Sequence, residues 1–210
     1  MAAAAPVLTY FAAPGRAFAI RVCLGIAGVE YANKHITFPE LVAGKADPAS
    51  FPLGQVPTFA IEGRTYAQSG AIARFAAKKA GLYPRDDDLA ALAIDEAVDT
   101  AQEFAGSVPQ LADAEQKKVA RGVWLEKKYP VFMAYFGRKV AASGGPFLGG
   151  ANLSLPDLLL YSSIDGIASG NWDFISPAVL DAYPWVAAHR NAVRTHPAVV
   201  QFGQLPAPKE

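Results

Sequence analysis

Gln68 and Ser69 stand where an apolar helical pattern begins, and residues of these types at a helix start can bind an anion. Ile72 and Phe75 mark one face of the predicted helix, and two lysines before Gly81 indicate its end. We expect Ser69 to be the N-cap. A helix start presents free backbone N–H groups and the positive end of the helix dipole. With an amide and a hydroxyl beside these donors, the sequence predicts a carboxylate site.

A predicted β-hairpin leads into this helix. Pro57 stands at the mouth of its first strand, a position that proline tolerates because it need not donate to a central ladder. Glu62 and Gly63 supply the turn between residues 59–61 and residues 65–66. The hairpin therefore fixes the direction from which the chain enters the helix.

The chain before the hairpin alternates between strand and helix. Residues 7–10 and 31–37 read as strands, and apolar residues at helical spacing predict a helix over residues 15–27. We expect a short helix over residues 39–45 and a loop up to Gly54. Cys23 lies on the apolar stripe of the first helix and is expected to be a buried, unreactive thiol.

The chain after residue 88 shows only helical patterns. Residues 81–88 have the composition of a linker, and their acidic triplet suits a helix start better than a metal site. Long helices are predicted over residues 89–108 and 114–143, with a break near Pro130. Ser154 and Asp157 form a capping box for the next helix. A last helix is expected over residues 184–195, before a proline-rich end.

Two motifs together resemble a known family. Gln55-Val56-Pro57, followed by the run from Gln68 to Ile72, is similar to the glutathione site of cytosolic glutathione S-transferases. With the N-terminal LTYF and GRA stretches, the chain most resembles the sigma class, which includes haematopoietic prostaglandin D synthases. The resemblance implies a thioredoxin-like α/β domain over residues 1–84 and an all-α domain over residues 85–210. It also implies glutathione as co-substrate and no metal.

In such an enzyme the glutathione thiol must become a thiolate, because the thiolate is the nucleophile. A hydroxyl that donates a hydrogen bond to sulfur favours the thiolate and lowers the thiol pKa. Tyr10, at the end of the first strand, is the expected donor, since residues 9–17 contain neither serine nor cysteine. The resemblance places Arg16 near the thiolate, where its charge can support the anion.

The resemblance also implies the contacts of the rest of the tripeptide. Gln55 and Val56 are expected to meet its cysteinyl backbone, next to a cis peptide bond before Pro57. Gln68 and Ser69 are expected to bind the γ-glutamyl carboxylate. The remaining contacts expected on the same basis are Lys45 for the glycine carboxylate and Phe38 as a wall of the site.

A homodimer is also implied, in which an acidic residue of one copy reaches the ligand's α-amino group in the other. Glu103 is the first candidate for that residue and Asp99 the second, because both lie on one predicted helix face. The expected contacts of the hydrophobic substrate are Phe11, Ala105 and Gln110. Pro14, Phe18 and Phe38 depart from the sigma-class pattern and, with Gln110, weaken a prostaglandin-specific role.

The composition of the 210 residues excludes several function classes. The net charge is zero, which argues against nucleic acid as a partner. No apolar run is long enough to span a membrane, and the opening lacks the pattern of a signal peptide. One cysteine allows no internal disulfide, and the three histidines are scattered, so we expect a cytoplasmic protein without a metal.

The sequence thus predicts an enzyme that conjugates glutathione to hydrophobic electrophiles, as in detoxification. Two alternatives stay open. One is a glutathione-dependent isomerase or peroxidase with the same contacts, and the other is a non-catalytic ligand-binding or crystallin-like relative, because a fold alone does not imply activity.

Overall fold

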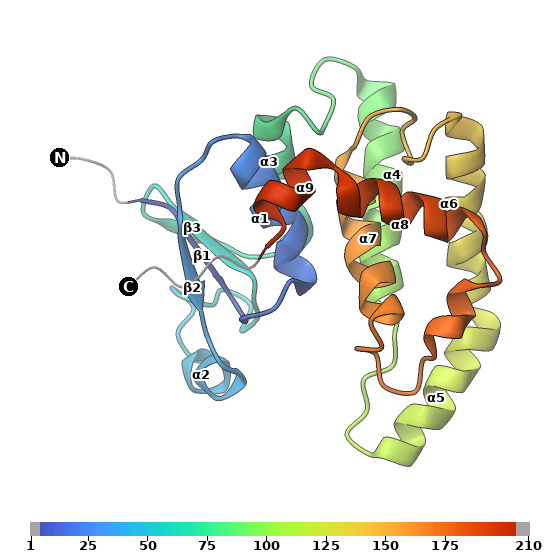
Figure 1. Ribbon diagram of the computed structural model, residues 1–210. Helices are drawn as coiled ribbons and strands as arrows, with labels where there is room; N and C mark the ends of the chain where they lie inside the picture. Colours follow the sequence, from blue (N-terminus) through green and yellow to red (C-terminus); the bar gives the residue numbers. More distant parts are fainter. Residues whose placement is uncertain (1–4, 205–210) are drawn as a thin grey trace. The chain divides into compact units, whose positions relative to one another are not determined.

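The computed structural model describes residues 5–204, which divide into two compact units. Unit 1 contains residues 5–85 and 197–204, and unit 2 contains residues 86–196 (Figure 1). Residues 1–4 of the opening and residues 205–210 of the proline-rich end lie outside the described residues.

Unit 1 is built on a four-stranded mixed sheet in the order β2-β1-β3-β4. Strand β1 runs parallel to β2 and antiparallel to β3, and β3 pairs with β4 as a hairpin. The strands are β1 (Val7–Tyr10), β2 (Ala32–His35), β3 (Thr58–Ile61) and β4 (Arg64–Tyr66). The hairpin turn forms where predicted, with both Glu62 and Gly63 at left-handed φ. This is the expected thioredoxin-like α/β arrangement.

Five helical segments belong to unit 1: the 3₁₀ turn η1 (Gly15–Ala17), α1 (Phe18–Ile26), α2 (Phe38–Gly44), α3 (Ser69–Ala80) and α9 (Pro197–Phe202). Helix α1 packs against α3, and Cys23 is fully buried as expected. Burial raises the pKa of the Cys23 thiol to about 12, so the thiol stays protonated at neutral pH.

Helix α9 was not predicted from the sequence, and it packs with unit 1 and not with the helical unit. Helix α9 packs beside α1 (Figure 1). The Phe202 ring lies directly against Gly25 of α1, where glycine leaves room for it, and Val199 is buried. Residues 197–204 therefore belong to unit 1, whereas we expected the helical domain to continue to the end of the chain. The packing also accounts for Phe18, which is buried next to Gly203 instead of carrying an exposed acidic side chain.

Unit 2 is all-helical. Its helices are α4 (Asp88–Gly106), α5 (Ala114–Lys127), α6 (Tyr129–Ser143), α7 (Leu155–Ala168), the 3₁₀ turn η2 (Pro177–Leu180) and α8 (Trp185–Thr195). The predicted break occurs between α5 and α6, with Pro130 in the first turn of α6. Proline is tolerated there because the first N–H groups of a helix have no acceptor within the helix. Asp87 caps α4 by accepting the Ala90 N–H at 2.9 Å, as expected for the acidic linker.

The core of unit 2 surrounds Phe104 on α4. Five rings lie with their centroids 5.5–6.4 Å from that of Phe104: Trp124, Tyr129, Phe132, Phe136 and Trp172. These distances suit offset and edge-to-face contacts, so aromatic packing fixes α4 against α5 and α6. Helix α7 is almost wholly buried.

The capping box at the start of α7 extends into a buried polar network. The Asp157 carboxylate accepts hydrogen bonds from the Ser154 N–H at 2.9 Å and its hydroxyl at 2.5 Å. Its other oxygen accepts the Leu148 N–H at 2.7 Å and lies 3.1 Å from Nε2 of the buried His189. Asp157 thus ties a loop and α8 to the start of α7, as a fold determinant.

Within residues 5–204, no helix combines the length and the apolar character that crossing a bilayer requires.

Candidate functional site

A cavity of about 450 Å³ in unit 1 brings together most of the predicted ligand contacts. Its volume is within the range of about 300–1,000 Å³ that small-molecule sites occupy. The lining residues are Phe11, Arg16, Phe38, Leu41, Lys45, Gly54, Gln55, Val56, Pro57, Gln68 and Ser69. Every one of them except Leu41 and Gly54 was named from the sequence. The cavity therefore carries two cationic side chains, two amides and a helix start on one concave surface.

Tyr10 is connected to this cavity through the backbone of Arg16. The Arg16 N–H donates a hydrogen bond to the Tyr10 hydroxyl oxygen at 3.1 Å. Tyr10 is 8% exposed, and its ring packs against Gly15 in η1. A phenol oxygen that accepts one N–H keeps its own hydrogen for donation. The tyrosine can therefore still donate to a thiolate.

The start of α3 differs in detail from the prediction. The N-cap is Gln68, with φ at 70°, and Ser69 is already the first helical residue. The left-handed φ of Gln68 turns the chain into the helix one residue earlier than the serine suggested. Ser69 is 6% exposed and lines the cavity together with Gln68. The helix has 12 residues, enough to give its N-terminal N–H groups a favourable field for a carboxylate.

Helix α2 positions a second part of the cavity. Thr37 and Glu40 form a capping box, in which the Thr37 side chain accepts the Glu40 N–H and the Glu40 carboxylate accepts the Thr37 N–H at 2.6 Å. Hydrogen bonds from Thr37 lower the pKa of the Glu40 carboxyl, so the box is intact at neutral pH. The helix thereby presents Phe38, whose side chain is 65% exposed, and Lys45, which caps its C-terminus.

The loop between α2 and β3 completes the cavity wall. The peptide bond between Val56 and Pro57 is cis, as expected. Gly54 has a left-handed φ of 60° and lies beside the aliphatic stem of Lys45. Gln55 is exposed, and Pro57 is buried at the entrance to β3.

Arg21 is a residue of this region that the sequence reasoning missed. It is 3% exposed on α1, and its guanidinium donates to the carbonyl oxygens of Ala13 at 2.8 Å and of Pro14 and Phe11 at 3.4 Å. These carbonyls belong to the loop that joins Tyr10 to η1. The available signal was a charged residue inside an otherwise apolar helix.

The expected contacts in the second half of the chain lie in unit 2. Asp99, Glu103 and Ala105 are on α4, and Gln110 follows it, accepting a hydrogen bond from the buried Arg121 at 3.1 Å. Glu103 lines an open cavity of about 370 Å³ between α4 and α6 that also contains Lys127, Lys128 and Arg138. The ligand contacts of Ala105, Gln110, Asp99 and Glu103, like those of the residues that line the cavity in unit 1, remain predictions.

Within residues 5–204, no cluster of three or more histidine, cysteine, aspartate and glutamate side chains could hold a metal ion.

Two family models match the chain. The model described as "Glutathione S-transferase, N-terminal domain" matches residues 6–78, and "Glutathione S-transferase, C-terminal domain" matches residues 98–204. Together they cover most of both units.

Individual relatives agree with the family models. Glutathione S-transferase 3 of Caenorhabditis elegans is 31% identical over 166 residues, which cover 75% of this chain and 77% of that protein. Glutathione S-transferase alpha M14 of Sus scrofa is 30% identical over 202 residues, covering 95% and 88%. Among solved structures, prostaglandin synthase D of Nilaparvata lugens matches with a TM-score of 0.82 and 26% identity, over 98% of this chain and 100% of that one.

Proposed function

The chain belongs to the glutathione S-transferase family and is a glutathione S-transferase with glutathione as its co-substrate, and we propose that Tyr10 activates the glutathione thiol. The observation that carries this proposal is the hydrogen bond from the Arg16 N–H to the Tyr10 hydroxyl, next to the cavity of unit 1. This bond orients the phenol and leaves its hydrogen for the sulfur. Donation to sulfur lowers the thiol pKa and raises the thiolate fraction at neutral pH.

The two ends of the tripeptide are assigned by charge. The γ-glutamyl carboxylate binds at the α3 start, to Gln68, Ser69 and the backbone N–H groups. The glycine carboxylate binds Lys45 at the end of α2. Gln55 and Val56 hold the cysteinyl backbone between these two points, so that its sulfur faces Tyr10 and Arg16. Catalysis then consists mainly of thiolate stabilisation and positioning.

The electrophile is proposed to be hydrophobic. Phe11 gives the cavity an aromatic side chain next to Tyr10, with ring centroids 5.3 Å apart. The positive charge of Arg16 suits the negative charge that develops on the electrophile as the sulfur attacks it. Conjugation of such compounds is a detoxification chemistry. The buried single cysteine is compatible with the cytoplasmic location that we propose.

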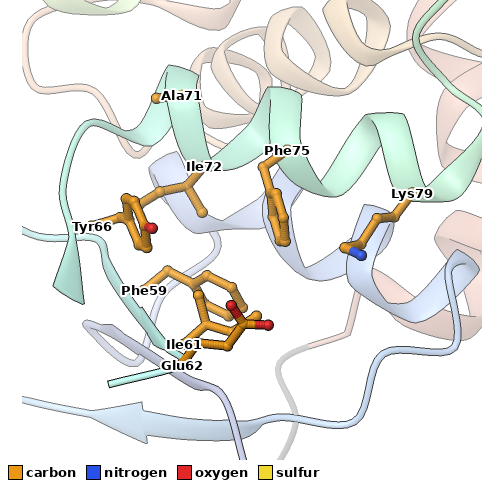
Figure 2. Close-up of a pocket in the computed structure, with 8 residues that line it drawn as sticks. All are labelled: Phe59, Ile61, Glu62, Tyr66, Ala71, Ile72, Phe75 and Lys79. Atoms are coloured by element: carbon orange, nitrogen blue, oxygen red, sulfur yellow. The ribbon is translucent and has the colours of Figure 1, made fainter. Parts of the chain in front are cut away.

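We infer that the enzyme is a homodimer of the sigma type, and exposed apolar side chains in unit 1 support this. A cavity of about 370 Å³ between β3, β4 and α3 is lined by Phe59, Tyr66 and Phe75, with Tyr66 and Phe75 43% and 37% exposed. Figure 2 shows side chains from α3 and from the hairpin pointing toward one another across this cavity, with Lys79 and Glu62 near one end. Isolated rings are common on surfaces, but rings gathered around a cavity indicate a contact surface.

Unit 2 offers the complementary surface. Leu89 and Leu92 on α4 are 78% and 64% exposed, and Glu96 and Glu103 lie further along the helix. Exposed apolar side chains on both surfaces favour a two-fold pair, in which unit 1 of one copy meets unit 2 of the other. Glu103, or else Asp99, then reaches the α-amino group of the partner's glutathione.

The test of thiol activation compares the wild type with Tyr10→Phe. We expect the wild type to conjugate glutathione to a chloronitrobenzene, and Tyr10→Phe to bind glutathione with similar affinity but to turn over about 10- to 100-fold more slowly. Unchanged turnover in the variant would exclude Tyr10 as the activator. If the wild type did not bind glutathione, the non-catalytic alternative would replace the proposal.

A glutathione-dependent isomerase is the second candidate, favoured by the match to the prostaglandin synthase of Nilaparvata lugens. The consumption of glutathione separates the activities. A transferase consumes one glutathione per product, a peroxidase oxidises two to a disulfide, and an isomerase returns the thiol unchanged. Measuring free thiol during turnover with an electrophile, a hydroperoxide and an endoperoxide therefore assigns the dominant activity.

A further inference from the structure

Arg21 on α1 donates hydrogen bonds to three backbone carbonyls of residues 11–14, the loop that joins Tyr10 to η1. Besides the three loop carbonyls, its Nε donates to the Asn33 side-chain oxygen at 3.1 Å. All of these acceptors are neutral. A guanidinium buried without a carboxylate loses hydration that its neutral acceptors restore only through well-formed hydrogen bonds. The position of each acceptor is therefore strongly constrained.

The three carbonyl acceptors are close together in sequence, in the loop between Tyr10 and η1. Residues 11–14 connect Tyr10, the last residue of β1, to Gly15, the first residue of η1. Residue 16 then supplies the N–H that the Tyr10 hydroxyl accepts. The path of this loop thus decides whether that N–H and the hydroxyl meet at hydrogen-bonding distance.

Arg21 itself is anchored from β2 and contacts the tyrosine directly. Asn33, which accepts from Nε, is buried on β2, and its side-chain nitrogen lies 2.5 Å from Nε2 of His35. His35 is the register partner of Tyr10 across the parallel β1–β2 pair. The Arg21 guanidinium carbon lies 5.8 Å from the centroid of the Tyr10 ring. The guanidinium is therefore held between β2 on one side and the loop and tyrosine on the other.

The charges around this guanidinium are consistent with a fixed cation. Burial lowers the pKa of Arg21, and the nearby Tyr31 and Tyr10 side chains oppose that shift. Burial, and secondarily the positive charge of Arg21, lowers the pKa of His35. Since arginine remains protonated under all ordinary conditions, the loop is held by a permanent charge.

We propose that Arg21 is a positioning residue for the thiol-activating tyrosine: it holds the carbonyls of residues 11, 13 and 14 so that the Arg16 N–H meets the Tyr10 hydroxyl. The inference rests on the proposed function, because it assigns Arg21 a role that is exerted through Tyr10. It concerns the geometry of the phenol and not the binding of the carboxylates of glutathione.

Lysine cannot replace arginine in this arrangement. The guanidinium offers donors in a planar fork, which serves Asn33 on one edge and the loop carbonyls on the other. A lysine ammonium keeps the charge but concentrates its donors at one point, so it satisfies only part of this set. Arg21→Lys therefore tests the geometry while retaining the charge.

The experiment measures the pKa of the bound glutathione thiol from its ultraviolet thiolate absorbance, and the glutathione Kd by calorimetry. For Arg21→Lys we expect the thiol pKa to rise by about one unit, with the Kd changed less than about threefold. Asn33→Ala removes the Nε acceptor, together with the Asn33–His35 contact, but leaves the loop carbonyls bound to Arg21, and it should shift the thiol pKa in the same direction by a smaller amount. In Tyr10→Phe, adding Arg21→Lys should produce no further shift, because Arg21 acts through the hydroxyl.

Arg121→Lys is the matched control. Arg121 is also 3% exposed and also donates to a backbone carbonyl, that of Pro109, but it belongs to unit 2. We expect it to lower the melting temperature without shifting the thiol pKa. A lower melting temperature with an unshifted thiol pKa in both Arg21→Lys and Asn33→Ala would overturn the inference. If wild-type protein bound glutathione without ionising its thiol, the proposed function would fail first, and the inference with it.

Discussion

The Tyr10 hydroxyl oxygen accepts a hydrogen bond from the backbone of Arg16, 3.1 Å away, so the orientation of the phenol depends on the main chain of η1 and not on the arginine side chain. Gly15, between them in the sequence, lies so close that a Cβ there would be 2.6 Å from the same oxygen. Three requirements thus meet in one short segment: a strand-end tyrosine, a glycine without a side chain, and the backbone N–H of Arg16 directed at the phenol oxygen.

Gly15→Ala is expected to displace the Tyr10 hydroxyl. The new methyl group would overlap the phenol, and misplacing a reacting group by this amount costs about 10- to 100-fold in turnover. Because φ of Gly15 is +39°, the variant should also lose roughly 1–2 kcal/mol of stability. We would measure kcat for conjugation of a chloronitrobenzene and the glutathione Kd.

Gly28→Ala serves as the control for Gly15→Ala. Gly28 has a φ of +63°, and a Cβ there would meet no atom within 4 Å. The control should share the loss of stability but keep wild-type kcat. Equal kcat in the two variants would contradict the proposed dependence on the phenol position.

Ser69→Ala should weaken glutathione binding with little change in kcat. A hydrogen bond to a charged group contributes about 1.5–3 kcal/mol, so the Kd should rise roughly 10- to 100-fold. The contact to a carboxylate is the same in the ground and transition states, which makes the loss one of uniform binding. A glutathione analogue without the γ-glutamyl carboxylate should bind wild type and variant equally. If Ser69→Ala weakened the binding of the analogue as much as that of glutathione, Ser69 would not be the contact of this carboxylate.

Acidification should destabilise unit 1 through His35. Burial, and secondarily the charge of Arg21, lower the pKa of His35 below its ordinary value of 6.5. Between that lowered pKa and 6.5 the unfolded chain binds more protons than the folded one, so the free energy of unfolding falls as pH falls. Above 6.5 both states are neutral and the effect vanishes.

The measurement is the melting temperature of wild type and His35→Gln between pH 7.5 and pH 5. Other titrating groups are the same in both proteins, so the difference between the two curves isolates His35. We expect His35→Gln to lose less stability on acidification. Parallel curves would show that protonation of His35 does not affect folding.

Asp157→Ala should be among the most destabilising single changes in unit 2. It leaves the Leu148 and Ser154 N–H groups and His189 without their buried acceptor, at a cost of about 3–5 kcal/mol. Ser154→Ala removes one capping contact and should cost about 1 kcal/mol. Urea unfolding followed by helical circular dichroism compares them, and similar midpoints for the two variants would refute a central role for Asp157.

The features that were predicted correctly depend on short-range rules. The capping box of Ser154 and Asp157, the turn at Glu62 and Gly63 and the break before Pro130 each follow from residues within a few positions of one another. The two motifs around Pro57 and Ser69 also named residues that line the cavity, because they carry a family pattern; their contacts with glutathione stay a prediction.

The features that were missed depend on long-range packing. Helix α9 is only six residues long and is stabilised by placing Phe202 against Gly25, a pairing that no local pattern contains. The carbonyl acceptors of Arg21 become neighbours only when the loop folds back on α1. Similarly, the shift of the α3 cap from Ser69 to Gln68 depends on a backbone angle, which residue type did not indicate.

The dimer proposal predicts that Glu103 of one copy completes the site of the other. Glu103→Gln should raise the glutathione Kd about 10-fold or more while leaving the thiol pKa in place, because it removes a charge beside the ligand's amino group. Light scattering at micromolar concentration should give the mass of two chains for wild type and variant. A monomeric mass would rule out any contribution from a partner copy.

A mixed dimer distinguishes a partner's Glu103 from one acting within its own chain. We would co-express Tyr10→Phe and Glu103→Gln copies with different affinity tags and purify the heterodimer through both. If Glu103 acts across the interface, one site of that heterodimer has an intact Tyr10 and receives an intact Glu103, while the other lacks both. Conjugation should then proceed at about half the wild-type rate at low glutathione, well above either homodimeric variant. If Glu103 acts in its own chain, each site carries one defect and the heterodimer shows only the mean of the two variants. The experiment is then repeated with Asp99→Asn in place of Glu103→Gln. If this heterodimer also shows only the mean of its two variants, Asp99 is excluded too, and the proposed cross-subunit contact is wrong.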